Sequence, residues 1–251
     1  MIEIEQSSKR GFAYGKESFE LLKSVKRLKF QNEKYERTGS ADIWSFDVEE
    51  YERIESSIDL LKISNLKCRH DVNFTFTTVH RLPQEGWEEL IDCWSCHNSE
   101  FKGMLDLKIK PRKNGILVSN FYLIAGEKVL PECCKARTKM FYNELTCEFS
   151  VEQLIFKFFE EYFEMKNSII LKVDGKSYEI KLFYRCILIE KNDSFVFNEH
   201  DAFKVGYKET AKNNDEDSYI GDYFKIKIID QLGRNSVKLS VLGYALSFIT
   251  Q

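Results

Sequence analysis

The chain contains few residues that interrupt regular structure, with three prolines and twelve glycines in 251 residues. This scarcity argues against long disordered or fibrous segments. The sequence also lacks any apolar run approaching the ~20 residues that span a bilayer, and its first residues, MIEIEQSSKR, lack the apolar core of a signal peptide. We therefore expect a soluble protein inside the cell, with no membrane association and with reduced thiols unless they bind a metal.

Motifs of the common enzyme classes are absent as well. The chain has no G-x-x-x-x-G-K-[ST], G-x-G-x-x-G or G-x-S-x-G motif, so nucleotide-binding and hydrolase functions lack support. Only four histidines are present for acid–base chemistry. The net charge of −3 provides no general attraction to nucleic acid, and we expect no direct nucleic acid binding. Single-stranded RNA binding by segments that combine aromatic residues with lysines, such as 223–227, is the weakest alternative.

Four of the seven cysteines form two close pairs, Cys93-x-x-Cys96 and the adjacent Cys133 and Cys134. Two thiolates separated by two residues can bind one metal ion, and a second pair would complete the tetrahedral coordination of zinc. His97, directly after the first pair, could replace one member of the second. The pattern predicts one structural zinc in a closed site rather than a catalytic one, because H-E-x-x-H is absent.

The second cysteine pair imposes a condition on the backbone. Adjacent side chains in a strand point to opposite faces, so both thiols can reach one ion only if the chain turns sharply after Pro131. The two pairs would meet if the sequence between them folded as a hairpin, with strands at 105–110 and 116–124 and a turn at 111–115.

Other uses of these cysteines remain open. Free cysteines can pack as small hydrophobic residues, although two close pairs are rarely needed for packing. A redox C-x-x-C would begin a helix, whereas here a helical pattern at 84–92 precedes the motif. Cys68 and His70, before a β-like segment, and His80 after it are reserve ligands, but single residues of these types more often pack or lie at the surface.

The apolar patterns indicate an α+β fold that is β-rich, with antiparallel sheets, a few helices and a zinc knuckle. We expect helices at 16–30, 84–92 and 150–166, strands at 43–48, 58–63, 72–79, 168–173, 176–189, 195–207, 223–229 and 237–245, and loops at 31–42 and 208–222. Turns are expected at Asp174-Gly175 and at Gly233. Alternate residues from Tyr178 to Leu188 should share one face, which makes Cys186 an inert core thiol.

The domain organisation follows from length and from these patterns. We expect one β-rich domain over residues 1–251, which can divide into two lobes. The first lobe would cover about residues 1–148 with the cysteine cluster, and the second about 149–251 with a helix and antiparallel strands.

Residues Trp87 to Phe101, W-E-E-L-I-D-C-W-S-C-H-N-S-E-F, followed by Lys110-Pro111-Arg112 and Pro131-Glu132-Cys133-Cys134, resemble the HECT-like family of ubiquitin ligases that bind ubiquitin-conjugating enzymes. This family includes a vertebrate ligase and a fungal factor for pre-mRNA cleavage and polyadenylation. The resemblance implies a protein of the nucleus and cytoplasm, a link to ubiquitin transfer and, for the fungal branch, an association with the metallo-β-lactamase-type endonuclease that cuts pre-mRNA.

The cysteine positions bear on catalysis. A HECT ligase passes ubiquitin through a thioester on an accessible cysteine near its C-terminus. No cysteine follows Cys186, and the isolated Cys147 has no histidine near it in the sequence. We therefore assign no catalytic and no cofactor-binding residue, and we favour a protein-binding factor over the alternative of an active ubiquitin ligase.

Aromatic residues and arginine anchor protein interfaces. On this basis Trp94, Phe101 and Arg112 are the predicted partner-binding residues. The alternative is that Trp94 shields the metal, in which case Phe156 and Phe163, on the second side of the helix at 150–166, become the candidates.

Overall fold

The computed structural model describes residues 1–38, 41–51, 59–82, 110–119, 122–135, 139–191, 197–212 and 220–250. Its contacts divide the chain into two compact units. The first, called the discontinuous unit, combines Met1–Ser57 with Val151–Gln251, and the second, called the central unit, is Ile58–Ser150. One boundary thus lies close to the lobe boundary predicted near residue 148, whereas the first 57 residues group with the C-terminal part.

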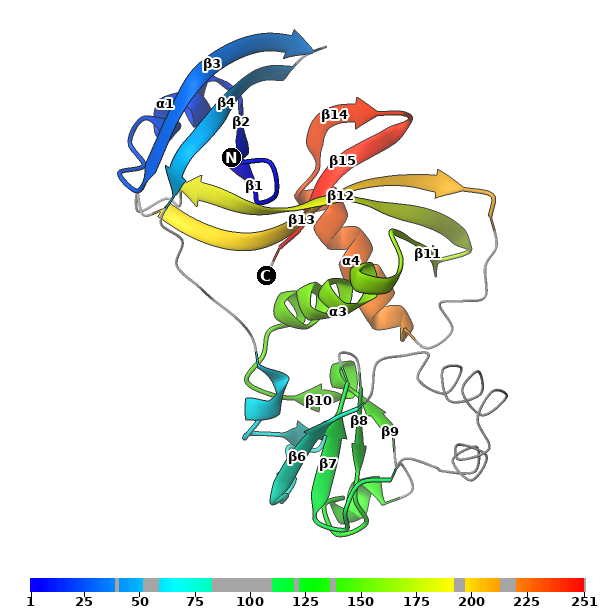
Figure 1. Ribbon diagram of the computed structural model, residues 1–251. Coiled ribbons are helices and arrows are strands. Elements are labelled where there is room, and N and C mark those ends of the chain that lie inside the picture. The colour runs from blue at the N-terminus through cyan, green and yellow to red at the C-terminus, as the bar shows by residue number, and fades with distance from the viewer. Residues whose placement is uncertain are drawn as a thin grey trace, which may run out of the picture. The chain divides into compact units, whose positions relative to one another are not determined.

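A large antiparallel sheet forms the discontinuous unit (Figure 1). Among the described residues it has nine strands, in the order β14-β15-β13-β12-β1-β2-β4-β3 with β11 also paired to β12. These are β1 (Ile2–Glu5), β2 (Arg10–Tyr14), β3 (Leu28–Thr38), β4 (Ala41–Tyr51), β11 (Ser168–Val173), β12 (Lys176–Lys191), β13 (Phe197–Thr210), β14 (Val237–Val241) and β15 (Tyr244–Thr250). The strand-rich α+β class is thereby confirmed.

Two of the three described α-helices of this unit, α3 (Val151–Met165) and α4 (Asp222–Arg234), lie on one side of the sheet (Figure 1). The third is the short α1 (Lys16–Leu22). The Phe156 ring on α3 stacks on the Phe203 ring of β13, with centroids 4.9 Å apart. The helix predicted at 150–166 is therefore confirmed, and its aromatic side chains pack on the sheet. No helix among the described residues is long and apolar enough to span a membrane.

Several predicted elements differ from the structure. The segment 223–229 is part of α4 rather than a strand, because Phe224, Ile228 and Leu232 recur every four residues and are buried together. Its lysines alternate with apolar residues, and this pattern is also typical of a strand. The predicted loop at 31–42 belongs mostly to the β3–β4 hairpin, which strand pairing stabilises although most β3 side chains are exposed.

Other elements end earlier than expected. The helix predicted at 16–30 ends at Leu22, and the chain enters β3 at Leu28. The strand predicted at 237–245 is interrupted by a turn at Leu242 and Gly243, where β14 ends and β15 begins, and Gly233 lies inside α4 instead of in a turn. By contrast, the predicted Asp174-Gly175 turn is confirmed, with both residues at positive φ between β11 and β12.

The central unit contains a four-stranded sheet and a two-stranded one among its described residues. The first consists of β6 (Thr78–Arg81), β7 (Gly115–Val118), β8 (Tyr122–Ala125) and β9 (Lys139–Phe141), and the second of β5 (Lys67–Cys68) and β10 (Leu145–Thr146). Three short 3₁₀ helices are also described: η1 (Leu60–Lys62), η3 (Glu132–Cys134) and η4 (Tyr142–Glu144). Only the β6–β7 pair is parallel among these described strands.

Three strand predictions in the central unit are corrected. The stretch 116–124 is not one strand, since β7 and β8 within it pair with each other antiparallel. The segment 58–63 contains η1 rather than a strand, and of 72–79 only the last residues belong to β6. Of the predicted strand at 105–110 only residue 110 is described, and the predicted helix at 84–92 lies outside the described residues.

A β-bulge in β12 changes which side chains share a face. Leu182 is opposite Val205 of β13, but Tyr184 is opposite Lys204, so Phe183 is the additional residue. Because Val205 and Lys204 are neighbours in β13 and point to opposite faces, Leu182 and Tyr184 do so too. The prediction that alternate residues from Tyr178 to Leu188 share one face is therefore wrong. The bulge turns Tyr184 toward Lys204.

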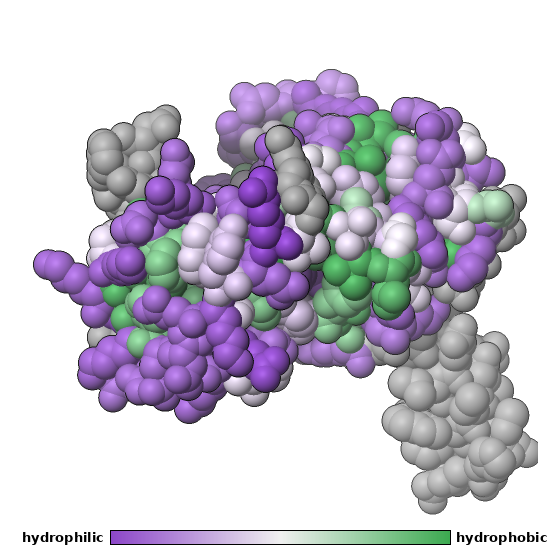
Figure 2. Space-filling model, turned by 90° about the horizontal axis from the view of Figure 1, so that it is seen from above, coloured by the Kyte–Doolittle hydropathy of each residue, from purple (hydrophilic) through white to green (hydrophobic). Residues whose placement is uncertain are grey.

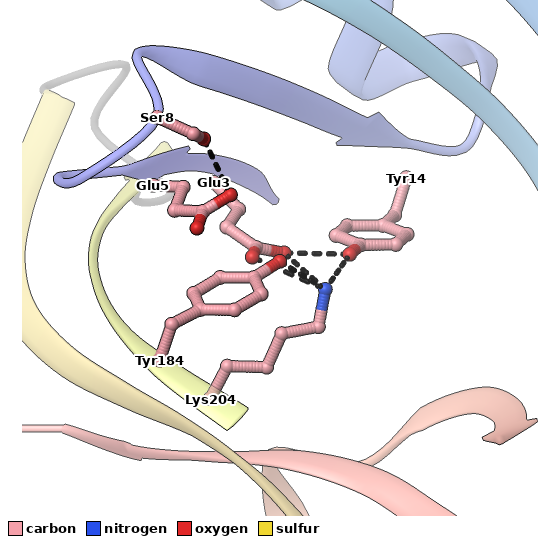
Figure 3. Close-up of polar contacts among 6 residues, drawn as sticks. All are labelled: Glu3, Glu5, Ser8, Tyr14, Tyr184 and Lys204. Carbon is pink, nitrogen blue, oxygen red and sulfur yellow. Dashed lines mark hydrogen bonds and ion pairs between the residues drawn. The ribbon is translucent and has the colours of Figure 1, made fainter. Parts of the chain in front are cut away.

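A buried ion pair lies on this face of the sheet (Figure 3). The Lys204 ammonium group donates to both carboxylate oxygens of Glu3, at 3.0 and 3.1 Å, and to the hydroxyl oxygens of Tyr14 and Tyr184, both at 2.8 Å. Glu3 is completely buried, and the Tyr14 hydroxyl donates to it at 2.6 Å. Burial and the Glu3 charge raise the pKa of both tyrosines. The group thus links β1, β2, β12 and β13.

Seven large hydrophobic side chains are exposed among the described residues. They are Tyr35, Leu61, Val72, Tyr223, Ile226, Val241 and Leu242. Figure 2 shows a face on which hydrophilic side chains predominate and hydrophobic ones form separate areas.

We expect Lys204→Met to lower the free energy of unfolding by roughly 3–5 kcal/mol, because it leaves the Glu3 carboxylate buried without its cation. Urea unfolding of the full chain measures this effect. The matched control is Lys29→Met, which removes an exposed partner of Glu50 and should leave the unfolding curve nearly unchanged. The double variant Glu3→Gln/Lys204→Met should lose less free energy of unfolding than the sum of the losses of Glu3→Gln and Lys204→Met. Equal stability of Lys204→Met and the control would refute the role of the pair.

Candidate metal site

Three cysteine side chains of the central unit meet at one point. The sulfur atoms of Cys68, Cys133 and Cys134 all lie within 4.8 Å of one another. The Cys68 and Cys133 sulfurs are 3.6 Å apart, and those of Cys133 and Cys134 are 3.8 Å apart. Zinc–sulfur bonds of about 2.3 Å in tetrahedral geometry place two sulfurs about 3.8 Å apart. The spacing therefore fits three ligands of one ion, and the cluster could hold a metal.

A tight turn after β5 positions Cys68. The residue is opposite Leu145 in the β5–β10 pair, and its carbonyl oxygen accepts a hydrogen bond from the Asp71 amide at 2.9 Å. Asp71 adopts a positive φ of 58°, and its carboxylate forms an ion pair with Lys67 at 2.8 Å. This turn also brings the ring of His70 to the site, with its Nδ1 4.0 Å from the Cys68 sulfur.

The 3₁₀ helix η3 positions the other two thiols. It begins after Pro131, and the Cys134 amide donates a hydrogen bond to the Pro131 carbonyl at 2.8 Å. A 3₁₀ helix has three residues per turn, so adjacent side chains differ in direction by about 120° rather than pointing to opposite sides. The sharp turn that the sequence required for a shared ion is therefore present, and it brings the Cys133 and Cys134 sulfurs together.

The cluster favours one negative charge and resists more. Burial acts to raise the pKa of the Cys68 thiol, but the backbone groups of Val72 and His70 and the side chains of Cys133 and His70 outweigh it and lower this pKa to about 6. Burial and the neighbouring sulfurs raise the pKa of Cys134 to about 12. Because three thiolates repel one another at this distance, a cation is needed to stabilise all three.

A cavity of about 250 Å³ adjoins the three sulfurs. Its other lining residues are Arg69, His70, Met140, Glu144 and Leu145. Cys68 is buried, whereas Cys133 is exposed and Cys134 is half-buried. The sulfurs are thus accessible to an ion from one side and supported by protein on the other.

The structure describes only some of the residues that the sequence predicted for this site. Cys133 and Cys134 are brought together, but Cys93, Cys96 and His97 lie outside the described residues. Cys68, a reserve ligand in the sequence, occupies the third position of the cluster. The signal for it was the Cys-x-His spacing with His70, which was too weak to decide without the fold. The other reserve ligand, His80, is an exposed residue of β6 outside the cluster.

Of the three predicted partner-binding residues, only Arg112 is described. Trp94 and Phe101 lie outside the described residues, whereas Arg112 is exposed. Its carbonyl oxygen accepts a hydrogen bond from the Gly115 amide at 2.9 Å in the turn before β7. Gly126 packs so closely on this turn that a Cβ atom there would lie 2.2 Å from the Arg112 carbonyl oxygen. The backbone of Arg112 is thus held in place while its side chain stays free to contact a partner.

The thiols of the two remaining described cysteines have raised pKa values. Cys186 is completely buried, which raises the pKa of its thiol well above the ordinary value, as expected for an inert core residue. Burial also raises the pKa of Cys147, which donates a hydrogen bond to the Phe149 carbonyl at 3.7 Å. Neither has the environment of an activated nucleophile.

Comparison with known proteins identifies the family. The family model described as HECT-like ubiquitin-conjugating enzyme (E2)-binding matches residues 23–149 of the 251. The chain belongs to this family. The match confirms the resemblance noted in the sequence, and it covers β3, β4 and nearly all of the central unit, including the three clustered cysteines. No curated protein and no solved structure matches the chain.

We expect protein purified without added metal to contain about one equivalent of a divalent ion, and chelation to lower the melting temperature, because metal binding contributes to the free energy of folding. Elemental analysis and thermal melting provide the measurements. Cys147→Ser is the control, since it removes a thiol of the same unit that lies outside the cluster. A metal content below about a tenth of an equivalent, with unchanged melting in chelator, would contradict the prediction.

Proposed function

We propose that this chain is a protein-binding factor that binds an E2 and that none of its five described cysteines carries ubiquitin. The family supports the E2 as partner. The statement about ubiquitin rests on the environments of the five described cysteines. The thiols of Cys147 and Cys186 have raised pKa values, and the other three cysteines form a cluster with the spacing of metal ligands. Thioester transfer needs an accessible, activated thiolate. Cys68, whose pKa is lowered, is buried and belongs to the cluster, where a bound metal would occupy it.

The metal of the cluster is zinc in this proposal, with a structural role. Thiolate ligands favour zinc over the harder divalent cations, which prefer oxygen. A zinc ion would join the turn after β5 to η3 and stiffen the central unit. A rigid surface loses little conformational entropy when a partner docks, which suits a binding factor.

A role in pre-mRNA 3′-end cleavage and polyadenylation is the finer part of the proposal. Its support is the sequence resemblance to a family that includes a fungal factor of that process. In this role the chain would bind or stabilise the cleavage endonuclease, and it would act in the nucleus and cytoplasm. The alternative is an active ubiquitin ligase, whose thioester chemistry the described cysteines do not favour.

The first experiment separates a binding factor from a thioester-forming ligase. In reactions with activating enzyme, E2 and ubiquitin, we expect the chain to bind at least one E2 of a panel and to show no thiol-sensitive ubiquitin adduct on non-reducing gels. Cys147→Ser and Cys186→Ser are the matched variants. An adduct that one of these substitutions abolishes would establish the ligase alternative.

A ligase that only positions a loaded E2 would form no adduct, so discharge is measured separately. The chain is added to an E2 that carries ubiquitin, and the rate of ubiquitin transfer to free lysine is followed. A simple binding factor leaves this rate unchanged. Acceleration without an adduct would assign the chain a positioning role in ubiquitin transfer.

The third experiment locates the partner surface. We expect Arg112→Ala to weaken E2 binding by at least about tenfold, in the range of an interface hot spot, without changing metal content or melting temperature. Lys113→Ala is the matched control, because Lys113 is an exposed neighbour in the same turn. Trp94→Ala should behave like Arg112→Ala. If both variants bind normally, the search moves to other surfaces, and if Trp94→Ala loses metal, that residue shields the site.

A further inference from the structure

We propose that Cys68, Cys133, Cys134 and His70 together form the zinc site, so that Cys93 and Cys96 are not among its ligands. This inference rests on the proposed structural zinc and specifies its ligands. It replaces the expectation from the sequence alone, in which the two close cysteine pairs share one ion.

The first argument is that three of the four positions are already formed. The sulfur–sulfur distances of 3.6 and 3.8 Å are close to the value of about 3.8 Å for two thiolates on tetrahedral zinc. Cys68 is the last residue of β5 and the other two cysteines lie in η3, so the ligands converge from segments 65 residues apart in sequence. Free thiols that merely fill space do not need three sulfurs in mutual contact.

The second argument concerns the backbone at Cys68. The Cys68 amide donates a hydrogen bond to the Val72 carbonyl at 3.0 Å, and the Asp71 amide donates one to the Cys68 carbonyl at 2.9 Å. Asp71, with its positive φ and its ion pair to Lys67, holds this turn closed. The backbone therefore fixes Cys68 where its sulfur meets that of Cys133.

The third argument assigns the fourth ligand to His70. In a tetrahedral site a nitrogen ligand lies about 3.6 Å from a sulfur ligand, and the His70 Nδ1 lies 4.0 Å from the Cys68 sulfur. The ring does not yet lie within 4.8 Å of all three sulfurs. His70 is exposed and lines the cavity beside the cluster, so a rotation about its side-chain bonds can bring the nitrogen to the ion.

This ligand set has a consequence for the family segment. A zinc ion that joins Cys68 to Cys133 closes a long loop, and that loop contains the Trp87–Phe101 motif and Arg112. Closing a loop restricts the unfolded chain and fixes both ends of the segment in the folded one. The ion would therefore hold together the two ends of the segment between Cys68 and Cys133, and no residue of the Trp87–Phe101 motif would bind it.

Variants of the full chain test the ligand set through zinc content and affinity, the latter measured by competition with a chromophoric chelator. We expect Cys68→Ser to weaken zinc binding by more than about 100-fold, beyond the 10–100-fold of an outer-shell change. His70→Ala should weaken it at least tenfold and shift the absorption of the Co²⁺-substituted protein. The double variant Cys93→Ser/Cys96→Ser should bind one equivalent with unchanged affinity, as should the control Cys147→Ser.

A measurement on the chain without substitutions covers the case in which Cys68→Ser fails to fold. Cysteine alkylation is mapped by mass spectrometry with and without a zinc chelator. We expect chelation to increase the modification of Cys133, Cys134 and Cys68, while Cys93 and Cys96 react equally in both samples. A chelator-dependent increase at Cys93 and Cys96, or zinc loss in their double variant, would overturn this ligand set. Absence of zinc from the unmodified chain would instead refute the proposed structural zinc itself.

Discussion

The buried ion pair between Glu3 and Lys204 is the interaction on which the discontinuous unit depends. A carboxylate removed from water is stable only when charge and hydrogen bonds compensate it, and Lys204 and the Tyr14 hydroxyl provide both. Because Glu3 lies in β1 and Lys204 in β13, the first strands of the chain pack with strands that follow residue 150. The central unit is consequently encoded between the two segments of the other unit.

In the central unit, too, ionisable groups that lie close together need a compensating charge. Its strands are short, and its clustered ionisable groups are the thiols of Cys68, Cys133 and Cys134. Three thiolates at this separation need a positive charge, which a metal ion would supply where a lysine does so in the discontinuous unit. Since the family match covers nearly all of the central unit, this charge requirement falls in the part of the chain that the family shares.

Local signals in the sequence predicted the elements that local contacts stabilise. The apolar period of α3 and the Asp174-Gly175 turn were both recognisable, because helix periodicity and left-handed turn residues act within a few positions. The segment that forms α4 was misread, since its lysines and apolar residues also alternate. The β3 strand was misread because its polar composition indicates a loop, and only pairing with β4 makes it a strand.

The sequence by itself determined the family, the strand-rich class and the participation of Cys133 and Cys134 in a thiol cluster, because these depend on residue types at short spacing. The tertiary structure decided that Cys68 joins them, since no spacing rule relates residues 65 positions apart. It also decided that Tyr184 faces Lys204, through a bulge at Phe183 that the alternation of side chains does not reveal. Both outcomes depend on the pairing of distant segments, where packing and strand register rather than local preference set the position of each side chain.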